Sequence, residues 1–288
     1  MLAVALKKFG LYVVGVSVLF GFPLAALFRL TMDSSLYSHI ILMPFVVLYL
    51  ARLKYLELRP AVGSSPRMAS GFAVGALVPL LVYGVIRMNG TELRAEDYLF
   101  LSILPFVLLL VAGGFLFLGN SCMRALSFPA SLLVFLAPMP VMVEAGLEIF
   151  FQHTSAEVSH WMLLLTGTPV LRDGLWFKLS TITIQVAQEC SGIRSSFVLF
   201  ITSLIAGHLF LKTTWKKVFL AVFIVPLAIV RNAFRIVTIG LLCVHVGPEM
   251  IHHAIHKRGG PVFFALSLIP FFVILLVLRR SDRNHGKE

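Results

Sequence analysis

Residues 187–211 have the sequence AQECSGIRSSFVLFITSLIAGHLFL, in which Cys190 and Arg194 stand at the head of a long apolar run. A transmembrane helix needs roughly 20 mostly apolar residues, so residues 192–211 predict one such helix. Other stretches of the chain meet the same requirement: 9–30, 36–51, 69–87, 98–118, 125–143, 217–243 and 260–278. We therefore predict an all-α polytopic membrane protein of about eight transmembrane helices, in a single domain over residues 1–288.

The composition agrees with a protein whose surface is largely in contact with lipid. Of the 288 residues, 59% are hydrophobic and only 13% are charged, and the mean hydropathy is +0.95. A soluble domain of this length could not bury so much apolar surface. The formal net charge of +11 could indicate a nucleic-acid partner. Basic loops on the cytoplasmic side are the simpler explanation, and the distribution of Lys and Arg described below supports it, so we expect lipid and no nucleic acid as partner.

The basic residues also predict an orientation. When the N-terminus is placed inside, the inside segments hold twice as many Lys and Arg residues as the outside segments. Cytoplasmic loops of membrane proteins show this bias. Both termini are therefore predicted to be cytoplasmic, with an uncleaved first span.

The long outer segment, residues 144–189, is predicted to contain two elements. Its first part, EAGLEIFFQHTSAEVSHWMLLLTG, has apolar residues at helical spacing and predicts an amphipathic helix on the outer surface. Its second part contains Asp173-Gly174, a turn pair, and the β-branched stretch LSTITIQVA. These features predict a small β-hairpin that delivers the chain to Cys190.

Cys190 is the first candidate for chemistry. Ser191 and Gly192 can cap and open a helix, so the thiol would lie at a helix N-terminus. The helix dipole and nearby Arg194 would lower the thiol pKa and favour the reactive thiolate, although the Glu189 carboxylate opposes this. The structural alternative is a small buried side chain, because cysteine is often fully buried.

The stretch RNAFRI, residues 231–236, places two arginines inside a predicted span. Each costs at least roughly 2.5 kcal/mol to insert, which favours a functional role. Arg231 and Arg235 share one helix face, and Asn232 can brace Arg235. Arg235 would lie roughly 27 Å along the helix from Lys217, close to the outer membrane face. The alternative is an interfacial arginine whose head reaches water.

The stretch HHAIHKRGG, residues 252–260, supplies His252, His253 and His256 just before the last span. Histidine can act as general base or acid near neutral pH, although a single loop histidine is usually only a polar surface residue. The predicted topology brings Cys190, Arg235 and these histidines to the outer membrane face. A thiol, a histidine and a cation at one level form a workable acyl-transfer centre.

Three motifs at these positions resemble the exosortase/archaeosortase family. CSGIRSS resembles its Cys-Ser-Gly motif, NAFR its Asn-x-x-Arg motif, and HKRGGPVFF its His-x-x-x-Gly-x-x-x-Phe pattern, over a motif-bearing core of residues 170–280. The resemblance implies Cys190 as nucleophile with Arg235 and His256 as catalytic partners. Gly192, Arg194, Asn232 and Gly260 would support them, with Arg231 and the pair His252 and His253 as alternatives.

The resemblance further implies a bacterial enzyme of the inner membrane, linked to exopolysaccharide production, with its site facing the periplasm. Its substrates would be exported proteins with a C-terminal tail made of a sorting motif, a transmembrane helix and a basic end, as in PEP-CTERM proteins. The enzyme would cleave near the outer face and pass the acyl group to an unknown acceptor, a lipid or a polysaccharide. No cofactor and no metal are expected.

Other interpretations of the same residues remain open. The enzyme could hydrolyse its substrate as a cysteine protease. The arginines could instead form an anion site in a polysaccharide export component, although no inverted repeat supports this. A disulfide between Cys190 and Cys243 would remove the nucleophile. A metal site from His252, His253, His256 and Glu249 is less favoured, because zinc sites need ligands at set spacing with supporting partners.

Overall fold

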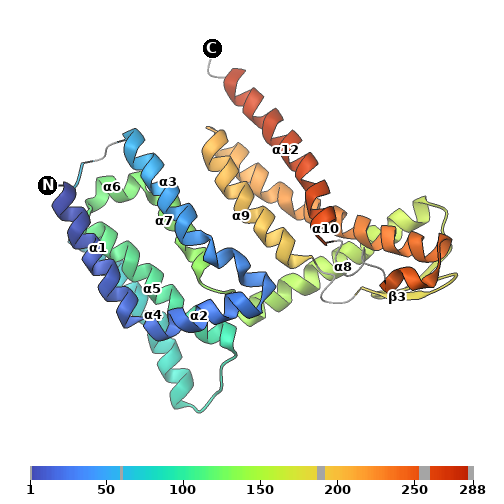
Figure 1. The fold of residues 1–288 in the computed structure, drawn as a ribbon, viewed down its shortest axis with the longest axis horizontal. Coiled ribbons are helices and arrows are strands. Elements are labelled where there is room, and N and C mark those ends of the chain that lie inside the picture. Colours follow the sequence, from blue (N-terminus) through green and yellow to red (C-terminus); the bar gives the residue numbers. More distant parts are fainter. Residues whose placement is uncertain (1, 59–60, 187–191, 253–259, 285–288) are drawn as a thin grey trace. The chain divides into compact units, whose positions relative to one another are not determined.

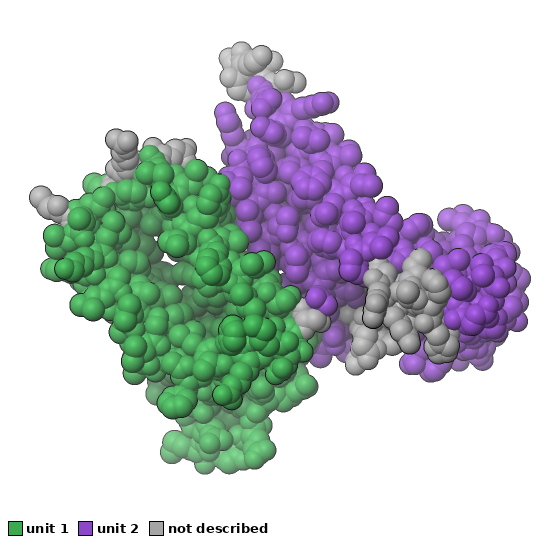
Figure 2. Space-filling view, in the orientation of Figure 1, with its two compact units in different colours: residues 1–144 green, residues 145–288 purple. Residues whose placement is uncertain are grey.

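The computed structural model describes residues 2–58, 61–186, 192–252 and 260–284. The chain divides into two compact units, unit 1 (Met1–Glu144) and unit 2 (Ala145–Glu288), coloured separately in Figure 2. Figure 1 labels many of the elements along the chain. The helices of unit 1 are α1 (Leu2–Leu19), α2 (Gly21–Asp33), η1 (Ser35–Ile41), α3 (Met43–Leu58), α4 (Pro66–Met88), α5 (Ala95–Phe117), α6 (Gly119–Ala125), α7 (Ser127–Leu132) and η2 (Leu133–Leu136).

The remaining elements belong almost entirely to unit 2. They are α8 (Val141–Leu165), β1 (Val170–Asp173), β2 (Trp176–Leu179), β3 (Thr183–Gln185), α9 (Ile193–Phe210), α10 (Thr214–His245), η4 (Pro248–His252) and α12 (Gly260–Asn284). Within the described parts of the chain, seven helices are long and apolar enough to cross a membrane, or eight if one bent pair counts as a span. The predicted all-α polytopic fold is confirmed.

The first expected span, residues 9–30, is wrong in its bounds. The helix α1 ends at Leu19 and a separate helix, α2, begins at Gly21. The break coincides with Pro23, which has no N–H to donate to the Leu19 carbonyl and disfavours helical geometry in the residue before it. The spanning segment is therefore Leu2–Leu19, and α2 is a second, shorter helix.

The fifth expected span, residues 125–143, is also not one helix. The short helices α7 and η2 end at Leu136, and the chain bends by 92° before α8. Pro138 and Pro140 lie in this bend and remove two backbone donors that a continuous helix would use. Val141 begins α8, where its N–H donates to the Asp97 carboxylate (2.9 Å).

The predicted β-hairpin is confirmed and extended by a third strand. The strands form an antiparallel sheet in the order β1-β2-β3, and Asp173 pairs with Trp176 across a two-residue turn. Gly174 adopts φ 58°, the left-handed geometry that glycine tolerates in such turns. The alternation of Phe177 and Leu179 inward with Trp176 and Lys178 outward follows the period of a strand.

The helix α8 confirms the predicted amphipathic helix, beginning three residues earlier than the sequence suggested. Its buried positions recur on one face: Phe151, Gln152, Ser155, Ala156, Ser159 and Leu163. This face packs on the sheet and on α10. The shared core contains Ala156 and Leu163 from α8, Phe177, Leu179 and Val186 from the sheet segment, and Ile236 and Val237 from α10.

The three long helices α9, α10 and α12 form the second core of unit 2. Leu199, Leu220 and Phe271, one from each helix, are completely buried in it. At one end of this core, the Asp282 carboxylate accepts a hydrogen bond from the Thr213 hydroxyl (2.6 Å). It also forms an ion pair with Lys216 (2.8 Å). Both members of the pair are buried, at 8% and 4% exposure.

We predict that Asp282→Ala destabilises unit 2 by about 3 kcal/mol or more, because it leaves the Lys216 ammonium buried without its counter-ion. The measurement is the thermal unfolding of the purified protein in detergent. Arg283→Gln is the matched control, since the neighbouring Arg283 side chain is exposed. An equal loss of stability in both variants would contradict the role assigned to the ion pair.

Candidate active site

The predicted site residues fall into two groups. Cys190, His253 and His256 lie outside the described residues, and the structure describes the backbone of His252 at the end of η4 but not its side chain. Gly192, Arg194, Gly260 and the RNAFR stretch of α10 are all described. The site is therefore built from the head of α9 and the facing turn of α10.

Gly192 is the N-cap of α9, and any other residue at this position would strain the backbone. Its φ is 70°, in the left-handed region that side chains with a Cβ disfavour. A Cβ at this position would also lie 3.0 Å from Arg231 Nη2 and 3.3 Å from Asn232 Oδ1. The glycine of the CSG stretch therefore lets α10 approach the backbone at the start of α9.

Arg231 makes that approach with hydrogen bonds. Its Nη2 donates to the Gly192 carbonyl (3.2 Å) and to Ser196 Oγ (3.1 Å). Ser196 in turn donates to the Gly192 carbonyl from its hydroxyl (2.7 Å). Arg231 is only 8% exposed. Its buried guanidinium therefore fixes the first turn of α9 through charge-assisted hydrogen bonds.

The other residues of the RNAFR stretch lie around this contact. Asn232 is 3% exposed and faces Gly192, and Arg235 is half-buried one turn further along α10. The sequence analysis favoured Arg235 over Arg231 as the cation at the level of Cys190. The structure brings Arg231, together with Asn232, to the helix start that follows Cys190.

Arg194 and Gly260 contribute less to the described geometry. The Arg194 side chain is exposed in the first turn of α9. Gly260 begins α12 and has no atom within 4 Å of the place where a Cβ would lie, so it leaves open space at the end of the helix.

Buried polar atoms without a hydrogen-bond partner mark this region of unit 2. Among the described residues, Arg231 Nη1, Ser155 Oγ and His160 Nδ1 are buried in this way. They lie on α8 and α10, two helices that approach each other where Ser159 Oγ meets the Ala233 carbonyl (3.5 Å). Native proteins rarely leave such atoms unsatisfied, so each of the three favours a functional role for this part of unit 2.

Both described ends of the segment that contains Cys190 are anchored. Val186 is 1% exposed, its N–H donates to the Leu175 carbonyl (2.9 Å), and its carbonyl accepts a hydrogen bond from the Gln152 amide. Gly192, at the other end, is held by Arg231. The sheet therefore holds the chain at Val186, and the predicted delivery to Cys190 concerns residues outside the described part of the chain.

The other two cysteines do not resemble nucleophiles. Cys122 and Cys243 are buried, at 1% and 0% exposure, and Cys190, the other half of the bridge considered above, lies outside the described residues. Burial raises the pKa of the Cys122 thiol, which keeps it protonated and unreactive. Over the described ranges, no group of three His, Cys, Asp or Glu side chains could hold a metal ion.

Sequence reasoning missed the residues that support Gly192 and Val186. Ser196 was not singled out, although a serine in the first turn of a helix often bonds back to the backbone. Gln152, Ser155, Ser159 and His160 were treated only as polar positions of an amphipathic helix. Their shared helical face was visible in the sequence, but the partner of that face was not.

Comparison with known proteins identifies the family. The model of the transmembrane exosortase family (Exosortase_EpsH) matches residues 31–273. Since this match covers most of the chain, the chain belongs to that family. In the broad sense of the family, it is a multi-pass membrane protein-sorting transpeptidase whose substrates are exported proteins with sorting signals. Searches of curated proteins and of solved structures each gave no match.

We predict that Gly192→Ala impairs the site, because the left-handed backbone costs about 1–2 kcal/mol for a residue with a Cβ and the Cβ crowds Arg231. Processing of a substrate protein in cells and the unfolding temperature of the purified variant should both fall. Gly146→Ala in α8 is the control, since nothing lies within 4 Å of its added Cβ. Normal processing by Gly192→Ala would refute this role of the glycine.

Proposed function

We propose that this member of the exosortase family is a membrane cysteine transpeptidase with Cys190 as its nucleophile. The proposed reaction cleaves the C-terminal sorting tail of an exported protein and transfers the new acyl group to an acceptor. The observation that carries the proposal is the buried Arg231 guanidinium, held on the first turn of α9 by the Gly192 carbonyl. Cys190 precedes that glycine by two residues in the sequence.

The geometry around Arg231 supports an anionic centre at the head of α9. A helix N-terminus carries partial positive charge from its unpaired N–H groups. Arg231 adds a full charge there, and one of its nitrogens, Nη1, is buried with no partner among the described residues. Positive charge at this position favours a thiolate over a thiol.

The proposed chemistry has two steps. The Cys190 thiolate adds to the scissile carbonyl carbon, the oxyanion collapses, and the C–N bond breaks as His256 donates a proton to the leaving amine. His256 then takes a proton from the acceptor, whose nucleophilic atom attacks the thioester carbonyl and releases the thiolate. We assign oxyanion stabilisation to Arg235, braced by Asn232, and positioning of the nucleophile to Arg231, with His252 and His253 as alternative proton carriers.

The proposed setting is the bacterial inner membrane, with both termini in the cytoplasm and the site facing the periplasm. Counting the bent pair as one crossing gives eight spans, which agrees with this orientation. The proposed substrates carry a PEP-CTERM-like tail with a sorting motif, a transmembrane helix and a basic end. The acceptor is a lipid or a polysaccharide, in keeping with a link to exopolysaccharide production.

We predict that Cys190→Ala and Cys190→Ser lower processing of a tail-bearing protein from the same genome by at least about 100-fold, because the covalent step is lost. The readout is the size shift of the substrate in cells, with enzyme abundance measured in parallel. Cys122→Ala and Cys243→Ala serve as controls that should process normally. Unchanged processing by Cys190→Ala would refute the cysteine mechanism and favour an anion-transport role for the arginines.

We predict that Arg231→Gln slows alkylation of Cys190 by iodoacetamide at pH 7 by about 3–10-fold, because removing a nearby cation raises a thiol pKa. The rates are measured against pH in a background with Cys122→Ala and Cys243→Ala, so that a single thiol reacts. Arg231→Lys keeps the charge and should restore most of the rate. A pH profile that does not move in Arg231→Gln would assign this arginine a purely structural role.

A further inference from the structure

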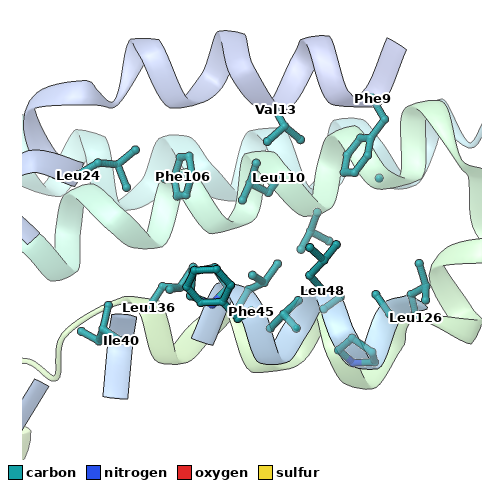
Figure 3. Close-up of a pocket in the computed structure, with 18 of the residues that line it drawn as sticks. Phe9, Val13, Leu24, Ile40, Phe45, Leu48, Phe106, Leu110, Leu126 and Leu136 are labelled. Carbon is teal, nitrogen blue, oxygen red and sulfur yellow. The ribbon is translucent and has the colours of Figure 1, made fainter. Parts of the chain in front are cut away.

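Unit 1 contains a large cavity that the proposed chemistry does not use. Its volume is about 750 Å³, and α1, α2, η1, α3, α5, α7 and η2 contribute to its wall. Figure 3 shows Val13, Phe45 and Leu110 among the side chains around it. The size is that of a binding site for a small molecule, which typically measures ≈ 300–1,000 Å³.

The wall of the cavity is hydrocarbon almost throughout. Thr31 is the one residue with a polar side chain among those that line it, and its hydroxyl already donates to the Phe28 carbonyl (2.7 Å). Water in such a cavity would find almost no hydrogen-bond partner, and apolar cavities instead take up apolar guests. The occupant must therefore present hydrocarbon to the wall.

The volume discriminates between kinds of hydrocarbon. A membrane-spanning helix of about 30 Å length and 10 Å diameter fills roughly 2,400 Å³, about three times the volume of the cavity. The transmembrane helix of a substrate tail is therefore too large. Flexible, linear chains such as the acyl chains of a lipid can enter the space and extend past its open side, where Phe45 and Leu48 are 68% and 69% exposed. The helices around it are membrane spans or neighbours of spans.

The two ends of the cavity differ in charge. Phe9 and Leu126 lie at one end, and Leu24, Ile40 and Leu136 lie at the other (Figure 3). Exposed basic residues adjoin the first end in the sequence: Lys7 and Lys8 before Phe9, Arg52 after the lining residue Ala51, and Arg124 two residues before Leu126.

Acidic side chains belong to the second end, where one exposed arginine, Arg29, also follows the lining residue Phe28. Glu144 accepts a hydrogen bond from Tyr37 (2.7 Å), three residues before Ile40. Asp97 binds the N–H of Val141, five residues after Leu136. Near the basic end, the sequence 52–58 also contains one acidic residue, Glu57. The charges therefore favour a negatively charged group at the Phe9 end and disfavour one at the opposite end.

We propose that this cavity holds the acyl chains of an anionic phospholipid, with the phosphate at the Phe9 end facing Lys7, Lys8, Arg52 and Arg124. By the predicted orientation, this is the cytoplasmic leaflet. The site lies within unit 1 and shares no residue with the candidate active site. The lipid acts as a structural ligand that completes the packing of unit 1.

The first test is native mass spectrometry of the full-length protein in mild detergent, titrated with phosphatidylglycerol. We expect one tightly bound molecule per chain. Val13→Trp fills the cavity and should weaken binding by about tenfold or more, the factor expected for losing roughly two buried methylene groups. Val14→Trp is the matched control on the same helix, because Val14 is 60% exposed. Equal binding by the two variants would overturn the proposal.

The second test addresses the charge. Phosphatidylcholine with the same acyl chains should bind at least about tenfold more weakly than phosphatidylglycerol. The double variant Lys8→Gln, Arg124→Gln should reduce that preference, whereas Lys212→Gln, Arg280→Gln, which removes two basic residues of unit 2, should retain it. Equal affinity of the wild type for both lipids would overturn the proposed headgroup. Displacement of phosphatidylglycerol by an equimolar polyprenyl phosphate would overturn it in favour of an isoprenoid.

A third measurement uses only the wild-type protein, so its result does not depend on whether a variant folds. Phosphatidylglycerol with a diazirine at mid-chain is photolysed with the wild-type protein, and the labelled peptides are identified by mass spectrometry. We expect labelling of the buried lining residues Phe106 and Leu136, which are 6% and 7% exposed, to exceed that of Leu77 and Leu81, which are exposed on α4 at 53% and 67%. Labelling that favours α4 would show only annular lipid and overturn the proposal.

Discussion

A guanidinium buried in a membrane helix must find acceptors, because no water is present to supply them. Arg231 finds two at the head of α9, the Gly192 carbonyl and the Ser196 hydroxyl. This contact ties α10 to α9 at the residue that follows the CSG cysteine by two positions. The left-handed Gly192 makes it possible, since a side chain there would meet the guanidinium at 3.0 Å.

The rest of unit 2 can be understood as support for that contact. The sheet packs between α8 and α10 through Phe177, and the Gln152 amide holds Val186 where the chain leaves β3. At the far end, Asp282 joins α12 to the start of α10 through Thr213 and Lys216. The helix α10, which carries both arginines, is thus fixed at each end. This support holds the Arg231 guanidinium in its position against α9.

Prolines shape unit 1 and the passage out of it. Pro23 separates α1 from α2, and Pro138 and Pro140 accompany the 92° bend before α8. These interruptions turn two expected spans into pairs of shorter helices. Short helices such as α2 and α7 leave space among α1, α3 and α5, and the cavity of unit 1 occupies it. A lipid in that cavity would restore the packing density that the bends prevent.

The sequence by itself determined the elements whose cause is local. The apolar stretches predicted α4, α5, α9, α10 and α12, because the length of an apolar run depends only on composition. The pair Asp173-Gly174 predicted the hairpin turn, and Gly192 was singled out with the helix start. The expected spans 9–30 and 125–143 failed because hydrophobicity was weighed and the prolines inside them were not.

Only the tertiary structure decided which side chains meet. Sequence spacing favoured Arg235 at the level of Cys190, which lies outside the described residues, but it did not predict that packing of α10 against α9 joins Arg231 to the Gly192 carbonyl. Ser155 and Ser159 looked like polar positions of a surface helix, yet both are completely buried. The cavity of unit 1 had no local signal at all, since its wall comes from segments more than 100 residues apart. Such contacts depend on how distant helices pack, and no local pattern encodes that.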